Sequence, residues 1–126
     1  MTTALELTPE EISVYRAAAW RRYEQEKREL AQREKQAWEA ARRAAAVLRE
    51  QFDATRVVVF GSLVHRGCFT PWSDVDIAAW GIRPQDTFRA IGAVMDLDAE
   101  IEVNLVDIQA CSPSLLTTIE RDGRDL

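Results

Sequence analysis

The sequence predicts an α/β fold: a small mixed β-sheet with helices packed on one side and a long N-terminal helix. Residues 10–51 contain neither proline nor glycine and consist mainly of strong helix formers. Two short apolar runs, Val57–Phe60 and Ile77–Trp80, are rich in β-branched or aromatic residues and are bounded by turn formers. Such runs are typical of buried strands. From Ile101 to Leu105 apolar and polar side chains alternate, which predicts a third strand in a sheet of three or four.

Length and charge limit the classes of function. A chain of 126 residues forms one modest core, which we divide into a helical extension at 1–36 and a domain at 37–126. There is no apolar run long enough to cross a bilayer and no secretory signal pattern, so we expect a cytoplasmic protein that does not bind membranes. The net charge of −5 argues against strong nucleic-acid binding, and the acidic excess lies in residues 51–126.

The N-terminal helix has a clear start signal. Residues 1–7 show no periodic pattern, and we expect a frayed or adhesive tail there. Thr8 is suited to cap the helix, with Pro9 in its first turn and Glu11 completing a capping box. We expect the helix to continue to about Gln51 and to pack on the domain through its last third.

The first part of this helix carries apolar and aromatic side chains that we expect to meet a second chain or to fold back. These side chains are Ile12, Tyr15, Ala19, Trp20 and Tyr23. Exposed Trp and Tyr favour a partner, either another protein or a second copy in a coiled-coil homo-oligomer. The alternative is a charged helix that stands in solvent without a partner.

The remaining elements alternate between strands and helices. In order they are a strand over Arg56–Phe60, a helical turn over Leu63–Arg66, a strand over Asp74–Trp80, a helix over Gln85–Leu97, a strand over Ile101–Ile108 and a short helix over Leu115–Arg121. The helix over 85–97 is expected to present Phe88, Ile91, Val94 and Met95 on one side.

Two aspartates stand at the start of the second strand. Residues two apart on a strand point to the same face, so Asp74 and Asp76 project together, roughly 6–7 Å apart. Two such carboxylates repel each other unless a cation lies between them, and Mg²⁺ prefers carboxylate oxygens. Gly61-Ser62 follows the first strand, where a glycine lets a ligand approach the backbone closely and a serine hydroxyl suits a phosphate oxygen.

The stretch from Val57 to Asp107 resembles the signature of the nucleotidyltransferase superfamily that includes DNA polymerase β. It looks specifically like a minimal nucleotidyltransferase (MNT) domain, whose pattern is a strand, Gly-Ser, a short spacer, Asp-x-Asp and a third acidic residue on a later strand. The resemblance implies that Asp74 and Asp76 bind Mg²⁺ as catalytic residues. It also implies that Gly61 and Ser62 hold the triphosphate of ATP or another NTP.

The third acidic position departs from the family pattern. The later strand reads Val103-Asn104-Leu105-Val106-Asp107, so Asn104 stands where the family often has an aspartate. An amide oxygen can still bind Mg²⁺, but one negative charge is lost, so we expect nucleotide binding to survive better than catalysis. Glu102, two residues earlier on the same face, can compensate as a metal ligand, whereas Asp107 is expected to point to the opposite face.

Other side chains near this stretch are candidates for nucleotide binding. Arg66 is placed to meet a phosphate or Asp74. Phe69 and Trp72 either stack on a base or close the loop over the core.

The resemblance implies a nucleotidyltransferase that moves a nucleoside monophosphate, with AMP from ATP expected, to a macromolecular acceptor. Stand-alone domains of this family often pair with a small helical HEPN protein and act as its antitoxin. The rival interpretation is a binding module that has lost catalysis, with Asn104 as the mark of that loss.

Overall fold

A computed structural model describes residues 6–126, so most of the expected N-terminal tail lies outside the described residues. The first helix, α1, runs from Pro9 to Phe52, as predicted. Its start is capped: the backbone N–H of Glu11 donates to Oγ1 of Thr8 at 3.1 Å. At its end Asp53 takes a left-handed conformation (φ 59°), and the N–H of Ala54 donates back to the Leu48 carbonyl at 3.1 Å.

The chain divides into two compact units, one ending at Gln32 and one spanning Arg33–Leu126. In the first unit the described residues are mainly the beginning of α1. Its aromatic side chains are exposed, with Trp20 at 60% and Tyr23 at 55%, and their rings lie 5.5 Å apart.

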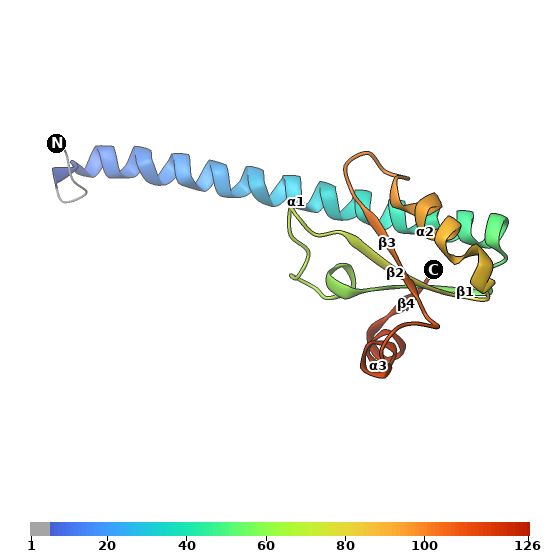
Figure 1. The fold of residues 1–126 in the computed structure, drawn as a ribbon. Helices are drawn as coiled ribbons and strands as arrows, with labels where there is room; N and C mark the ends of the chain where they lie inside the picture. Colours follow the sequence, from blue (N-terminus) through green and yellow to red (C-terminus); the bar gives the residue numbers. More distant parts are fainter. Residues whose placement is uncertain (1–5) are drawn as a thin grey trace. The chain divides into compact units, whose positions relative to one another are not determined.

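The second unit contains a four-stranded mixed sheet in the order β3-β2-β1-β4 (Figure 1). Its strands are β1 (Arg56–Phe60), β2 (Val75–Trp80), β3 (Val103–Asp107) and β4 (Arg124–Asp125). β1 pairs antiparallel with β2 and with β4, whereas β2 and β3 are parallel. The predicted α/β class with a mixed sheet is therefore confirmed. The short β4 joins the edge in a polar segment that has no strand pattern of its own.

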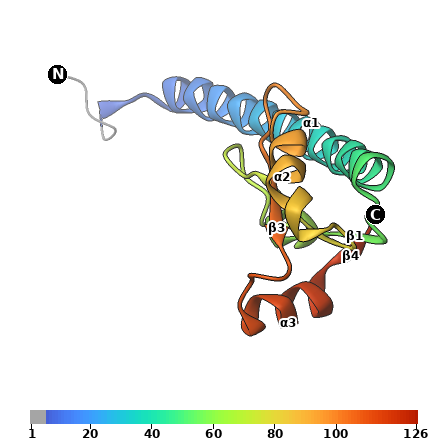
Figure 2. The same ribbon diagram turned by 45° about the vertical axis from the view of Figure 1, so that its right-hand side comes forward.

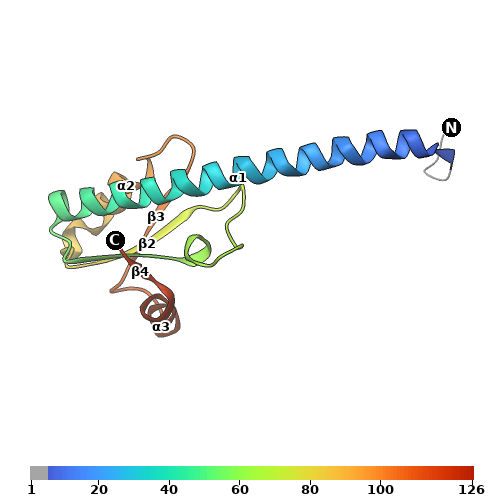
Figure 3. The ribbon, with the colours of Figure 1, turned by 180° about the vertical axis from the view of Figure 1, so that it is seen from behind.

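Helices cover both faces of this sheet. The part of α1 from Arg33 onward and α2 (Thr87–Met95) lie over one face, and α3 (Pro113–Asp122) lies over the other (Figures 1 and 3). Ile119 of α3 packs against Val58 and Ala78. The structure thus adds α3 on the face opposite α1. The physical reason is that the apolar runs of β1 and β2 are continuous rather than alternating, so both of their faces need a cover.

The second helix buries only part of the side that was predicted: Val94 is buried and Ile91 and Met95 are partly buried, but Phe88 is not. A short 3₁₀ turn over Pro84–Asp86 precedes α2, and the buried residues of α2 are Ala90 and Val94. Phe88, expected on the buried side, is 88% exposed. Two residues along a helix turn the side chain by about 200°, so Phe88 faces away once Ala90 packs beside β3. Figure 2 shows α2 running next to β3.

The last helix starts and ends close to its predicted bounds. The N–H of Leu115 donates to Oγ of Ser112, which caps α3 at 3.2 Å. Within residues 6–126, no helix combines the length and the apolar character that a membrane crossing requires.

Candidate functional site

Strand register brings the predicted site residues to one edge of the sheet. Phe60, the last residue of β1, lies opposite Asp76 in β2, and Asp76 lies opposite Asn104 in β3. The end of β1, with Gly61, therefore meets the starts of β2 and β3. Asp76 shares a sheet face with Ala78, which belongs to the cluster under α3, so the site lies on the face that α3 covers.

Gly61 lies directly against the Asp76 carboxylate. Its φ is +77°, a left-handed conformation that favours glycine. A Cβ placed on Gly61 would lie 2.8 Å from Oδ2 of Asp76, so the carboxylate would have to shift to admit any side chain. The backbone of the Gly61-Ser62 turn is thus exposed to the same space that the Asp76 carboxylate enters.

The Asp76 carboxyl group is partly buried and poorly compensated. Its pKa is raised above the ordinary value of 3.8, chiefly because burial disfavours the charged form. A hydrogen bond with the Asn104 side chain opposes this rise, and repulsion by Asp74 adds to it. The structure therefore brings Asp74, Asp76 and Asn104 together, and the site has an excess of negative charge.

Glu102 and Asp107 lie at the two ends of β3. Glu102 is exposed, and its carbonyl accepts a hydrogen bond from the N–H of Val75 at 3.0 Å. Asp107 accepts from the N–H of Gln109 at 3.0 Å. Among the residues that the structure describes, no group of three His, Cys, Asp or Glu side chains is arranged to hold a metal ion. A cation at this edge would therefore be held by Asp74 and Asp76 with an amide oxygen from Asn104. These hard oxygen donors fit Mg²⁺.

The residues proposed to contact phosphate are accessible. Ser62 lies in the 3₁₀ turn over Gly61–Val64 and is partly exposed. Arg66 is exposed, and within residues 6–126 its side chain makes no hydrogen bond or ion pair. His65 lies beside α3, with Nε2 3.9 Å from a carboxylate oxygen of Asp122.

The loop between β1 and β2 uses its two aromatic residues differently. Phe69 is 4% exposed and closes the loop over the core, whereas Trp72 is 85% exposed. The backbone N–H of Thr70 donates to Oγ of Ser73 at 2.9 Å, which shapes the turn just before Asp74. Trp72 is thus the aromatic side chain of this loop that remains available to a ligand.

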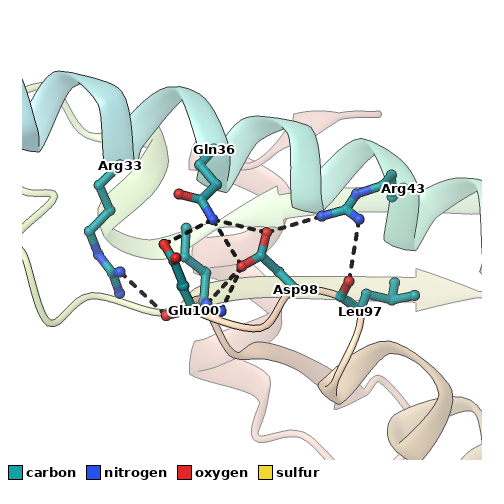
Figure 4. A network of polar contacts seen from close by, with 7 residues as sticks. Arg33, Gln36, Arg43, Leu97, Asp98 and Glu100 are labelled. Carbon is teal, nitrogen blue, oxygen red and sulfur yellow. Dashed lines mark hydrogen bonds and ion pairs between the residues drawn. The ribbon is translucent and has the colours of Figure 1, made fainter.

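Sequence reasoning missed a polar network that joins α1 to the turn between α2 and β3 (Figure 4). Asp98 is its centre: it accepts from Nε2 of Gln36 at 3.1 Å and pairs with Arg43 at 3.0 Å. Asp98 also accepts from the backbone N–H groups of Glu100 (2.8 Å) and Ile101 (3.0 Å). An aspartate before a strand that binds backbone N–H groups two and three residues on is a turn signal, and it could have identified Asp98 as structural.

Hydrogen bonds lower the pKa of Asp98. Burial alone would raise that pKa, but hydrogen bonds from the Glu100 and Ile101 backbone and from Gln36, together with the charge of Arg43, outweigh the effect of burial. The carboxylate of Asp98 is thus ionised and fully paired in the folded protein.

Comparison with family models finds none that matches this chain, and no curated protein matches it significantly.

Proposed function

We propose that this protein is a Mg²⁺-dependent nucleotidyltransferase of the minimal type, which transfers AMP from ATP to a macromolecular acceptor. One observation carries the proposal: a partly buried carboxylate, Asp76, lies against the bare backbone of Gly61 and beside Asp74 and Asn104. A raised carboxyl pKa at an open backbone turn is typical of a functional site rather than of a structural ion pair.

The chemistry assigns a role to each group. Bound Mg²⁺ would offset the charge that builds up on the phosphates. Asp74 and Asp76 would hold the ion, with Asn104 supplying an amide oxygen. The backbone and hydroxyl of Gly61-Ser62 would bind the triphosphate, with Arg66 pairing a phosphate oxygen.

In the transfer step an acceptor hydroxyl oxygen forms a bond to the α-phosphorus of ATP. The bond from that phosphorus to the bridging oxygen breaks, and pyrophosphate leaves with its electron pair. The hydroxyl proton passes to a site carboxylate or to water. Since Asn104 cannot accept this proton as an aspartate would, the proposal predicts slow transfer.

The test is calorimetry of Mg–ATP binding to the wild type and to Asn104→Asp. We expect the wild type to bind and the variant to bind about tenfold more tightly, or about 1.4 kcal/mol, because a third carboxylate gives the cation another charged oxygen ligand. Asp74→Asn with Asp76→Asn serves as the negative control and should abolish binding. Transfer of labelled AMP to a co-purified partner then tests turnover. Absence of binding in both the wild type and Asn104→Asp would contradict the proposal.

A second candidate is a catalytically weak module that acts by binding a protein partner. Two observations favour it. Asn104, which forms a hydrogen bond with Asp76, brings no negative charge and no proton acceptor of the kind that an aspartate would supply. In addition, the first unit exposes large hydrophobic side chains on α1: Val14, Tyr15, Trp20 and Tyr23. A HEPN-type protein or a second copy of this chain would cover them.

The two candidates separate in one experiment. If Trp20→Ala with Tyr23→Ala abolishes partner binding or self-association while Mg–ATP binding is retained, the helix is a docking surface independent of the nucleotide site. If the variant that combines Asp74→Asn with Asp76→Asn still neutralises the partner biologically, the binding-module function is favoured over the enzyme.

A further inference from the structure

Arg33 on α1 connects the two chain segments that lead into the candidate site. Its Nη2 donates to the carbonyl of Ser73 at 3.2 Å, and its Nη1 donates to the carbonyl of Glu100 at 3.4 Å. Ser73 immediately precedes Asp74, and Glu100 precedes the strand that carries Asn104. One guanidinium group therefore links the approaches to β2 and β3.

A backbone hydrogen bond at the start of the pairing between β2 and β3 also joins the two segments that Arg33 links. The N–H of Val75 donates to the carbonyl of Glu102 at 3.0 Å. Asp74 lies one residue before β2 begins, so the ladder of regular strand hydrogen bonds does not include it. The position of Asp74 relative to Asp76 and Asn104 consequently depends on what holds the backbone at Ser73.

Burial of one nitrogen of the Arg33 side chain indicates that this contact has a cost. Its Nε is buried and has no hydrogen-bond partner among the described residues. An unpaired buried donor costs roughly 1–3 kcal/mol. A shorter or apolar residue would avoid that cost, but only a planar guanidinium offers two N–H groups in the fork that spans two separate carbonyls.

We propose that Arg33 is a positioning residue that holds Asp74 in register with Asp76 and Asn104. The proposal has two parts. Arg33 clamps the segments at 73–75 and 100–102, and this clamp preserves the geometry in which the site binds a metal–nucleotide complex. The second part rests on the proposed function, whereas the first does not.

Arg43 provides a matched control on the same helix. It also donates to a backbone carbonyl, that of Leu97 at 3.3 Å, and to the Asp98 carboxylate at 3.0 Å. Its partners, Leu97 and Asp98, lie on the turn after α2 (Figure 4). Neither of them adjoins Asp74 in the sequence. Removing Arg43 thus weakens the attachment of α1 without releasing Ser73.

The decisive measurement is amide hydrogen exchange of the full chain, resolved at residues 73–76 and 100–104. In Arg33→Ala we expect the Val75 amide to exchange about tenfold faster or more, as for the loss of a supporting hydrogen bond. Arg43→Ala should lower the Tm but leave exchange at Val75 unchanged. Arg33→Lys distinguishes a clamp from a simple charge effect, because it keeps the positive charge but lacks the rigid planar fork of the guanidinium; it should behave like Arg33→Ala.

Calorimetry with Mg–ATP on the same variants tests the second part. We expect Arg33→Ala and Arg33→Lys to bind several-fold more weakly than the wild type, and Arg43→Ala to bind as the wild type does. Unchanged exchange at Val75 in Arg33→Ala, or equal acceleration in Arg43→Ala, would overturn the clamp. Full affinity in Arg33→Lys would assign the effect to charge and overturn positioning. If the wild type itself does not bind Mg–ATP, the proposed function fails, and exchange alone still decides the clamp.

Discussion

Asp76 and Asp98 are both partly buried aspartates that meet a side-chain amide, yet folding moves their pKa values in opposite directions. Asp98 receives two backbone N–H groups, the Gln36 amide and the charge of Arg43, and its pKa falls. Asp76 receives only the Asn104 side chain and faces the like charge of Asp74, so burial dominates and its pKa rises. The contrast distinguishes a carboxylate whose charge the fold stabilises, Asp98, from one whose charge the fold leaves poorly compensated, Asp76.

The network at Asp98 should give the largest stability effect. Asp98→Ala removes an acceptor from several donors at once, so we expect a loss of about 2–3 kcal/mol in the free energy of unfolding at pH 7. The measurement is urea unfolding monitored by circular dichroism. Asp96→Ala is the control, because Asp96 is exposed and should change stability by less than about 0.5 kcal/mol.

The same variant makes a pH prediction. Because the folded-state pKa of Asp98 is lowered from the ordinary 3.8, its stabilisation is present above pH 3.8 and is lost as pH falls through the lowered pKa. The charge-dependent part of the difference between wild type and Asp98→Ala should therefore shrink below pH 3.8. A difference that stays constant to low pH would show that the carboxylate charge contributes nothing.

The Gly61 contact should give a smaller and more specific effect. Gly61→Ala puts a Cβ 2.8 Å from the Asp76 carboxylate in a left-handed conformation. Gly67→Ala is a close control, since Gly67 has a φ of +80° and nothing lies within 4 Å of its added Cβ. We expect the left-handed alanine to lower the free energy of unfolding by about 1–2 kcal/mol at either site, with a further loss only at Gly61.

A double-mutant cycle with Asp76→Ala then isolates the contact between Gly61 and the carboxylate. The extra loss in Gly61→Ala should disappear when Asp76 is already truncated. If the two glycine variants are equally destabilised, the close approach of Gly61 to Asp76 is absent in solution.

The smallest effect is expected at Asp76 itself, and its sign is opposite to that at Asp98. The raised folded-state pKa means that ionisation of Asp76 disfavours folding, so Asp76→Asn should raise the Tm at pH 7 by a few degrees. This gain should fade as pH falls through the raised pKa and vanish below 3.8, where the carboxyl group is protonated in both states. Mg²⁺ should stabilise the wild type but not Asp76→Asn. A lower Tm for Asp76→Asn at pH 7 would place Asp76 with Asp98 as a structural residue.

Local sequence signals predicted most of the elements. The cap at Thr8, the start and end of β1 and the approximate bounds of α3 match the structure, because each depends on a few neighbouring residues. Asp74 and Asp76, from their spacing, and Asn104 were likewise predicted from the sequence as candidate site residues. Phe88 shows the limit of such signals: it was grouped with Ile91, Val94 and Met95, yet it is exposed while Val94 is buried, because the helix turned so that Ala90 packs on the sheet.

The sequence by itself determined most of the helices and strands, the cap of α1 and which polar residues lie at strand ends, because these properties depend on short-range periodicity and backbone sterics; β4, which has no strand pattern, was decided by its pairing with β1. Only the tertiary structure decided that Asn104 lies opposite Asp76 and that Gly61 closes against the same carboxylate. It also decided that Arg33 and Gln36 reach partners 40 and 62 residues away in the chain. Such pairings depend on strand register and on how the helices cover the two faces of the sheet. Both are set by burial of the whole core and not by neighbouring residues in the chain.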